Sequence, residues 1–197
     1  MNITTPQPIQ LAFCGKISLG QSFRRAVRED VKSRHFVLQS RDLSPEGCLS
    51  SDLMPMGTTN EPPKTNIAPG DIVVLCRGVR FNAGVVHTLP GPTTAQSMFY
   101  IVRLRADCGL TPEYVASFIN TPAVQDHLKS LAKGATVQHL KVDDLGSLRI
   151  PVPPMAQQRT LVALARAIAE EQKLSQQLSS LRKQQFSLLL NSLTHQT

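Results

Sequence analysis

Short apolar segments with the two-residue period of β-strands recur along the first 105 residues. Ile9–Phe13 and His35–Gln39 alternate apolar and polar positions, as strands of a half-buried sheet do. Asp71–Cys76 is instead a continuous apolar run, which is typical of a strand buried on both faces. Ala83–His87 follows it after a glycine-containing turn and is predicted as the returning strand of a hairpin. Met98–Arg105 is predicted as a further strand.

The next part of the chain predicts two helices with clear beginnings. Thr111-Pro112 and Thr121-Pro122 each place a capping hydroxyl before a proline at the first helical position, where the missing N–H breaks no hydrogen bond. We expect Gly134 to be the C-cap of the second helix. Val142–Leu145 is predicted as one helical turn, and Leu148–Pro154 as a strand that its prolines end. Strands before and after helices predict an α+β body with a mixed or antiparallel sheet.

A single long helix is predicted from Met155 to about Leu190, because this stretch has no Gly or Pro and its apolar residues recur every three or four positions. A six-residue step in the middle of this stripe departs from a strict heptad repeat. At 1.5 Å per residue the helix extends about 54 Å, which is more than the expected width of the body. The stripe therefore needs a partner helix, although Leu161 and part of Leu164 could pack on the body. The predicted domains are residues 1–154, the α+β body, and residues 155–197, a helix able to form a coiled coil. The residues predicted to form the helix interface are Leu164, Ile168, Leu174, Leu178 and Leu181.

The composition describes an ordinary folded protein with an excess of positive charge. Of the 197 residues, 41% are hydrophobic and 18% are charged, which argues against disorder. No apolar run approaches the roughly 18 residues that cross a bilayer, and no basic stretch leads into an apolar one at the N-terminus, so we expect a cytoplasmic location. The formal net charge is +7 and the pI is about 9.6. Such a charge raises affinity for phosphate backbones and favours a nucleic-acid partner.

The residues that usually carry catalysis are scattered. Cys14, Cys48, Cys76 and Cys108 lie 28 to 34 residues apart without a C-x-x-C pair, so we interpret them as reduced and mostly buried. There is no glycine-rich phosphate loop, nucleophile elbow or methyltransferase signature. The adjacent pair Asp143-Asp144 is interpreted as a helix cap rather than an acid–base pair. We therefore expect a non-catalytic protein without a metal or cofactor.

Three segments place basic and amide side chains on predicted loops. The hairpin tip contributes Arg77, Arg80 and Asn82, and Arg and Asn have the bidentate geometry that reads guanine and adenine edges. Gln39 and Arg41, after the second strand, form a weaker group. Lysines in such loops contact phosphates and fix the register on a duplex. For any single residue the alternative interpretation is an exposed side chain without a function. The loop before the long helix contributes the DNA-binding candidates Lys133, Thr136, Gln138, His139 and Lys141.

The end of the body resembles a known family. Lys133-Gly-Ala-Thr-Val-Gln-His-Leu140, Asp144-Leu145 and Ile150-Pro-Val-Pro-Pro-Met-Ala-Gln-Gln158, followed by a long helix, are similar to the end of a target recognition domain. Such domains belong to the specificity subunit of type I restriction-modification systems. Residues 69–74 and 99–105 also fit the pattern of that family.

Two features depart from the family pattern. Gln157 stands where the family usually has Glu, and the chain carries one target domain and one helical region where family members normally carry two of each. The chain therefore resembles half of a subunit. The resemblance implies a non-catalytic role, in which the body reads one half of a split DNA sequence while the helices dock methyltransferase subunits and, in full complexes, the translocating endonuclease subunit.

A half subunit is completed by a second copy paired through the C-terminal helix. Two-fold symmetry would then make the target an interrupted palindrome. A helix of about 54 Å would separate the half-site centres by at most about 16 base pairs at 3.4 Å each. The alternative is a truncated specificity module that binds or sequesters methyltransferase subunits without specific DNA readout. That module would have the same fold.

Overall fold

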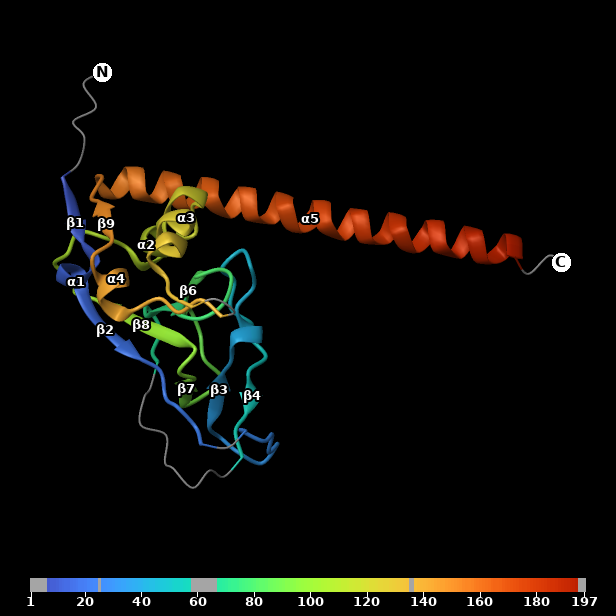
Figure 1. Ribbon diagram of the computed structural model, residues 1–197, viewed down its shortest axis with the longest axis horizontal. Helices are drawn as coiled ribbons and strands as arrows, with labels where there is room; N and C mark the ends of the chain where they lie inside the picture. Colours follow the sequence, from blue (N-terminus) through green and yellow to red (C-terminus); the bar gives the residue numbers. More distant parts are fainter. Residues whose placement is uncertain (1–6, 25, 58–66, 135–136, 195–197) are drawn as a thin grey trace, which may run out of the picture. The chain divides into compact units, whose positions relative to one another are not determined.

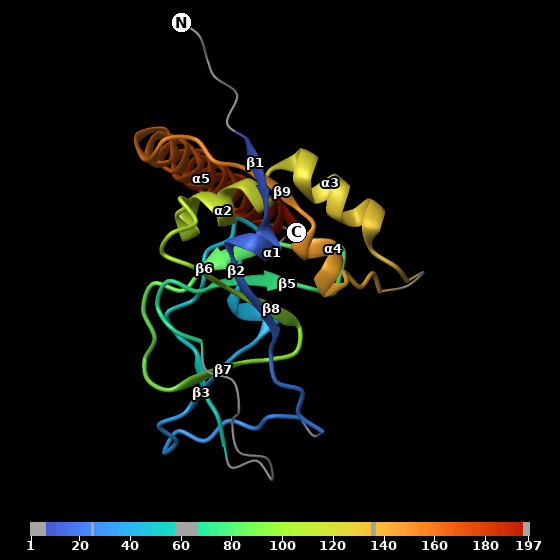
Figure 2. The ribbon, with the colours of Figure 1, turned by 90° about the vertical axis from the view of Figure 1, so that its left-hand side faces the viewer.

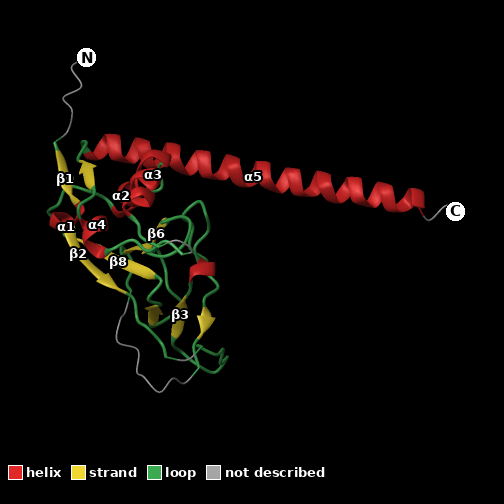
Figure 3. Cartoon of the chain, in the orientation of Figure 1, coloured by secondary structure: helices red, strands yellow, loops and turns green. Residues whose placement is uncertain are grey.

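Residues 7–24, 26–57, 67–134 and 137–194 are described by the structure, which is a computed structural model. The chain divides into two units, Met1–Arg159 and Thr160–Thr197. The first unit mixes strands and helices, and the second continues one long helix (Figures 1 and 3). The elements in chain order are β1 (Pro8–Gln10), α1 (Leu11–Cys14), β2 (Gly15–Leu19), β3 (Phe36–Leu38), the 3₁₀ turn η1 (Ser40–Asp42), β4 (Met54–Pro55), β5 (Ile72–Leu75), β6 (Ala83–Val85), β7 (Thr93–Ala95), β8 (Phe99–Leu104), α2 (Pro112–Ile119), α3 (Pro122–Leu131), α4 (Val142–Gly146), β9 (Arg149–Pro151) and α5 (Met155–Thr194).

Four strands form the central sheet in the order β2-β8-β5-β6, with antiparallel pairing throughout. Val73 of β5 and Phe99 and Ile101 of β8 are at most 3% exposed and pack with Leu38 of β3 in one apolar cluster. Each such side chain contributes roughly 1.5–3 kcal/mol when it is removed from water. A second sheet, β4-β3-β7, contains one antiparallel and one parallel pair, and β1 pairs with β9. The predicted α+β fold with mixed or antiparallel sheets is confirmed.

A bidentate ion pair ties the start of β5 to β8. The Arg103 guanidinium donates to both carboxylate oxygens of Asp71, from Nε at 2.7 Å and from Nη2 at 2.6 Å. Asp71 is 2% exposed and also accepts a hydrogen bond from the Ala68 N–H at 2.8 Å. These bonds compensate the burial of a carboxylate, which is unfavourable without partners. The hydrogen bond and the charge of Asp71 raise the pKa of Arg103 above its usual value.

The predicted first strand is wrong in its second half. β1 ends at Gln10, and the remainder of the predicted segment forms the helical turn α1. The Leu11 N–H donates to the Leu148 carbonyl oxygen at 2.9 Å, and Leu11 and Cys14 are both fully buried. Burial three residues apart is a helical spacing, so tertiary packing overrides the local alternation.

The two Thr-Pro helix starts are confirmed, but the caps differ from expectation. The Thr111 hydroxyl accepts from the Tyr114 N–H at 3.3 Å and caps α2. The Thr121 hydroxyl instead donates to the Phe118 carbonyl oxygen at 2.8 Å. The predicted C-cap at Gly134 is wrong, because α3 ends at Leu131 and Ala132 is already extended. Gly134, at φ +125°, allows a close approach to Val137, whose carbonyl oxygen would lie 2.3 Å from an added Cβ.

The first turn of α5 is hydrogen-bonded to the loop that precedes α2. Gln158 is fully buried, and its amide oxygen accepts from the Thr111 N–H at 3.0 Å. Its amide nitrogen donates to the carbonyl oxygens of Gly109 at 2.7 Å and Pro153 at 2.9 Å. Three backbone groups that no strand or helix satisfies are therefore satisfied by one side chain. Gln157, the position that departs from the family pattern, is exposed.

The long C-terminal helix is confirmed, and α5 spans 40 residues from Met155 to Thr194. Within the second unit, the predicted stripe is solvent-exposed along its length. Leu161 and Leu164 are 40% and 57% exposed, and so are the later members: Ile168 (46%), Leu174 (55%), Leu178 (48%) and Leu181 (61%). In the described part of the chain, no helix is both long and apolar enough to cross a membrane.

Replacing Gln158 by Ala should lower the free energy of unfolding of the first unit by about 2–3 kcal/mol, because it leaves buried backbone groups without partners. The matched control is Gln157→Ala, the same substitution one residue earlier at an exposed position, which should change stability by less than about 0.5 kcal/mol. Urea unfolding of both variants measures the difference. Equal stabilities for the two variants would contradict the assigned role of Gln158.

Candidate nucleic-acid interface

Two loops that are distant in the sequence form one edge of the first unit. The Leu140 N–H donates to the Cys76 carbonyl oxygen at 2.9 Å, and the Gly78 N–H donates to the Gln138 carbonyl oxygen at 3.0 Å. Arg77 and His139 face each other in an antiparallel bridge. Figure 2 shows α3 and α4, the helices on either side of the second loop, next to each other beside the central sheet. The hairpin tip and the loop before α4, each predicted separately as a binding loop, are thus held together by their backbones.

The loop before α4 is also closed on itself. The His139 N–H donates to the Lys133 carbonyl oxygen at 2.8 Å, and the Lys133 N–H donates to the His139 carbonyl oxygen at 3.1 Å. We name the surface formed by both loops the basic edge, and it comprises Arg77, Arg80, Lys133, Gln138, His139 and Lys141. The two arginines and two lysines are exposed, whereas Gln138 and His139 are half-buried.

Two side-chain amides hold the hairpin tip from behind. The Gln125 amide of α3 accepts from the Phe81 N–H at 3.0 Å and donates to the carbonyl oxygens of Phe81 at 3.1 Å and Ile119 at 2.9 Å. The Asn120 amide accepts from the Ala83 N–H and donates to the Ala83 carbonyl oxygen, both at 2.8 Å. Each amide pairs with the chain as a neighbouring strand would. The tip is therefore fixed before any ligand binds.

Two buried, neutral side chains under the basic edge donate hydrogen bonds to backbone carbonyl groups. The buried Tyr100 hydroxyl of β8 donates to the Leu140 carbonyl oxygen at 2.9 Å, and the Cys76 thiol donates to the Ser97 carbonyl oxygen at 3.4 Å. Burial is the main cause that raises the pKa of Tyr100 and also that of Cys76. Both groups stay neutral near pH 7, so Cys76 is a structural thiol rather than a nucleophile.

The positive charges of the basic edge have no acidic partners within the described residues. Arg77, Arg80, Lys133 and Lys141 make no ion pair there, whereas Arg103, Arg105 and Lys129 each pair with an aspartate. Unpaired guanidinium and ammonium groups on a fixed loop attract an anionic ligand at close range. Among the residues that the structure describes, no group of His, Cys, Asp and Glu side chains is arranged to hold a metal ion.

Not every predicted residue belongs to this edge. Asn82 is only 7% exposed, so the expectation that the tip presents its amide is wrong. The physical reason is that Gln125 and Asn120 draw the backbone on both sides of Asn82 into the first unit. Thr136 lies outside the described residues.

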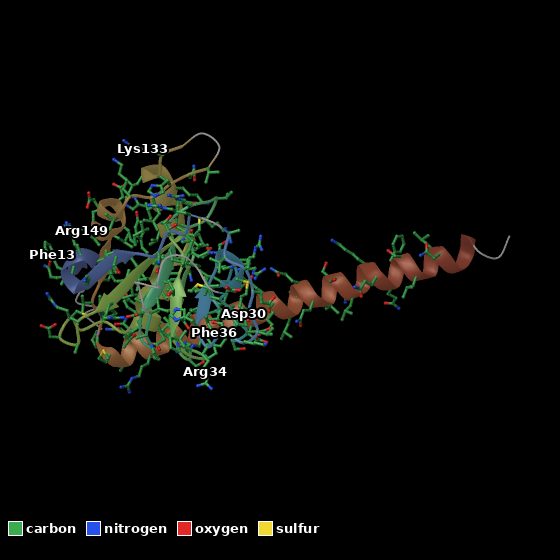
Figure 4. The ribbon with its side chains drawn as sticks, turned by 90° about the horizontal axis from the view of Figure 1, so that it is seen from below. Phe13, Asp30, Arg34, Phe36, Lys133 and Arg149 are labelled. Atoms are coloured by element: carbon green, nitrogen blue, oxygen red, sulfur yellow. The ribbon has the colours of Figure 1, made fainter. Side chains whose placement is uncertain are left out.

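Gln39 and Arg41 lie at η1, the 3₁₀ turn that follows β3 of the second sheet. The Gln39 N–H donates to the Asp42 carboxylate at 2.7 Å, and Arg41 is exposed with its guanidinium 3.5 Å from the Met54 sulfur. In the view of Figure 4, Lys133 and Phe36, the first residue of β3, lie on opposite sides of the first unit. No hydrogen bond among the described residues joins Gln39 or Arg41 to the basic edge.

No protein-family model and no curated protein matches the sequence. Solved structures do match. The type I restriction-modification S subunit from M. genitalium aligns over 92% of this chain and 43% of its own, with a TM-score of 0.53 and 17% identity. The HsdS subunit from Thermoanaerobacter tengcongensis aligns over 87% of this chain and 39% of its own, with a TM-score of 0.55 and 18% identity.

A third match comes from a structure of complex assembly and conformational transition in the type I restriction-modification system. It covers 91% of this chain and 40% of that chain, with a TM-score of 0.58 and 17% identity. The chain spans about two fifths of the length of the subunits that it matches. The expected resemblance is confirmed at the level of the fold: the chain shares the fold of about two fifths of a type I restriction-modification specificity subunit.

Proposed function

We propose that the chain is the sequence-specific DNA-recognition subunit of a type I restriction-modification complex, and that it reads one half of a bipartite target. The observation that carries this proposal is the basic edge, where two loops are joined by backbone hydrogen bonds and carry four cations without acidic partners in the described residues. The net charge of +7 and the fold of specificity subunits support the same conclusion. The subunit is non-catalytic, uses no cofactor and acts in the cytoplasm.

The side chains of the basic edge divide the work of recognition. Arg77 and Arg80 are suited to guanine and Gln138 to adenine, because guanidinium and amide groups bond two atoms of those base edges at once. Lys133 and Lys141 are suited to phosphates, which position the protein without reading sequence. His139 is suited to contact either a base edge or a phosphate. Thr136 in the same loop, and Gln39 and Arg41 at η1, are proposed as additional contacts.

The second unit assembles the complex. The exposed stripe of α5 needs a helical partner, because a helix this long keeps an apolar face in water only at a cost in free energy. We assign it to a second copy of the chain, so that a homodimer through α5 presents two basic edges. The remaining surface docks the methyltransferase subunit and, in a full complex, the restriction and translocase subunit.

Selection from randomised duplexes, with the cognate methyltransferase present, tests the readout. The wild-type chain should enrich a bipartite motif, and Arg77→Ala should weaken binding to it by about 1–3 kcal/mol and relax one base position. The control is Lys129→Ala, because Lys129 is already paired with Asp126 at 3.3 Å and should not matter. A chain that binds the methyltransferase but enriches no motif would instead be a sequestering module.

The double variant Lys133→Ala/Lys141→Ala should weaken binding to every duplex alike and leave the enriched motif unchanged. Each lost phosphate contact lowers the slope of log K against log salt by about 0.9, so the slope should fall by about 1.8. Titrations of a random duplex at several salt concentrations measure the slope. An altered motif with an unchanged slope would contradict the assignment of these lysines to phosphates.

Pairing through α5 is tested with the double variant Leu174→Asp/Leu178→Asp, which should be monomeric because two charges enter the apolar stripe. Gln176→Asp/Ser180→Asp adds the same charges at the same four-residue spacing on the opposite face of the helix, and it should remain dimeric. Light scattering after gel filtration gives the masses. A wild-type chain that stays monomeric, with and without methyltransferase, would refute the homodimer.

A further inference from the structure

Each of the two loops that form the basic edge carries an exposed valine. Val79, in the hairpin tip, is 83% exposed and is the most exposed large apolar side chain in the described part of the chain. Val137, in the loop before α4, is 59% exposed. Single apolar side chains on a surface are common and need no explanation. One in each of two loops that are bonded together is a different case, because their positions are related.

The backbone pairing brings the two valines next to each other. The loops run antiparallel, and the Gly78 N–H donates to the Gln138 carbonyl oxygen at 3.0 Å. Val79 follows Gly78 and Val137 precedes Gln138, so this register places the two valines opposite each other. In a regular ladder the Cβ atoms of such a pair are about 4.5–5.5 Å apart, close enough to form one apolar patch. We name Val79 and Val137 the valine pair.

Two glycines fix the positions of the valine pair. Gly78 has a φ of +122°, which L side chains rarely adopt, and this conformation directs the chain into Val79. Gly134, at φ +125°, leaves room for the Val137 carbonyl oxygen, which an added Cβ would meet at 2.3 Å. Valine is itself stiff, because branching at Cβ restricts χ1. The pair therefore offers a preformed apolar contact that loses little conformational freedom on binding.

The same loops also carry Arg77, Arg80, Lys133 and Lys141, which are exposed. A ligand of this surface must therefore combine negative charge with an apolar group. The major groove of B-DNA does so, because phosphates line its walls and the methyl group of thymine is the apolar group among its base edges. The groove is about 12 Å wide and admits a two-stranded β-ribbon. The two bonded loops form such a ribbon.

We propose that the bonded loops enter the major groove and that the valine pair contacts the methyl group of a thymine in the half-site. The inference rests on the proposed DNA readout and deepens it by naming one base. Arg77, Arg80 and Gln138 read hydrogen-bonding edges, whereas the valine pair reads a methyl group. It selects thymine against cytosine, because cytosine carries only a hydrogen atom at the same ring position.

Replacement of thymine by uracil in the enriched duplex tests this contact with the wild-type chain. Uracil still pairs with adenine and keeps the O4 acceptor, so only the methyl group is lost. Each thymine of the motif is replaced singly, and affinity is measured with the cognate methyltransferase present. At one thymine of the half-site the dissociation constant should rise about three- to fivefold, as expected for one methyl group removed from an apolar contact.

The double variant Val79→Ala/Val137→Ala assigns the effect to the valine pair. It should bind the thymine duplex more weakly than the wild type does, and it should bind the thymine and uracil duplexes equally. Val31→Ala is the matched control, because Val31 is 81% exposed and lies in the loop before β3. In Figure 4 its neighbours in the sequence, Asp30 and Arg34, lie away from Lys133 of the basic edge. This variant should keep the wild-type affinity and the wild-type response to uracil.

The outcomes separate this inference from the proposed function. A motif without thymine, or a uracil series in which no position changes the affinity of the wild-type chain, overturns the methyl contact and leaves the DNA readout standing. An unchanged response to uracil in the double variant overturns it as well. A chain that enriches no motif overturns the proposed readout, and this inference falls with it.

Discussion

The amide of Gln125 is the interaction on which the basic edge depends. At Phe81 the hairpin tip leaves the strand ladder, and its buried N–H and carbonyl groups have no neighbouring strand. A buried backbone group without a partner costs about 1–3 kcal/mol, so a tip with this path would not be stable by itself. Gln125 supplies both missing partners and also bonds the end of α2, while Asn120 repeats the device at Ala83. The corner between α2 and α3 thus fixes the tip to which the loop before α4 is bonded.

The sequence predicts those parts of the molecule that have a strong local period or a clear boundary. The hairpin of β5 and β6, the Thr-Pro starts of α2 and α3 and the long helix all follow from such signals. The sequence pattern does not predict β2 or β7: Lys16–Leu19 alternates polar and apolar residues over only four positions, and Thr93–Ala95 has no alternation. Their strand conformation comes from pairing with β8 and β3, which are distant in the sequence.

The candidate site was predictable only in part, because its two loops are joined by main-chain hydrogen bonds that no side-chain pattern records. The predicted exposure of Asn82 is wrong for the same reason. A polar residue near a turn gives the same sequence signal whether hydrogen bonds of its neighbours' backbone bury it or leave it exposed. One signal was available: Gln125 stands between Val124 and Leu128 on the buried side of α3, where a polar residue needs a structural reason. Gln158 gives a similar signal, whereas the departure at Gln157 concerns an exposed position.

The two units place opposite demands on their sequences. In the basic edge, main-chain bonds and the buried amides hold the loops, so the exposed side chains of Arg77, Arg80, Lys133 and Lys141 contribute little to stability and are free to change with the ligand. In α5 the exposed apolar side chains are not free to change, because in the proposed homodimer they form the contact with the second copy. In the proposed homodimer every change at one position of the stripe occurs twice, once in each copy. The two proposed roles, DNA readout by the basic edge and pairing through α5, therefore depend on separate sets of residues within one chain.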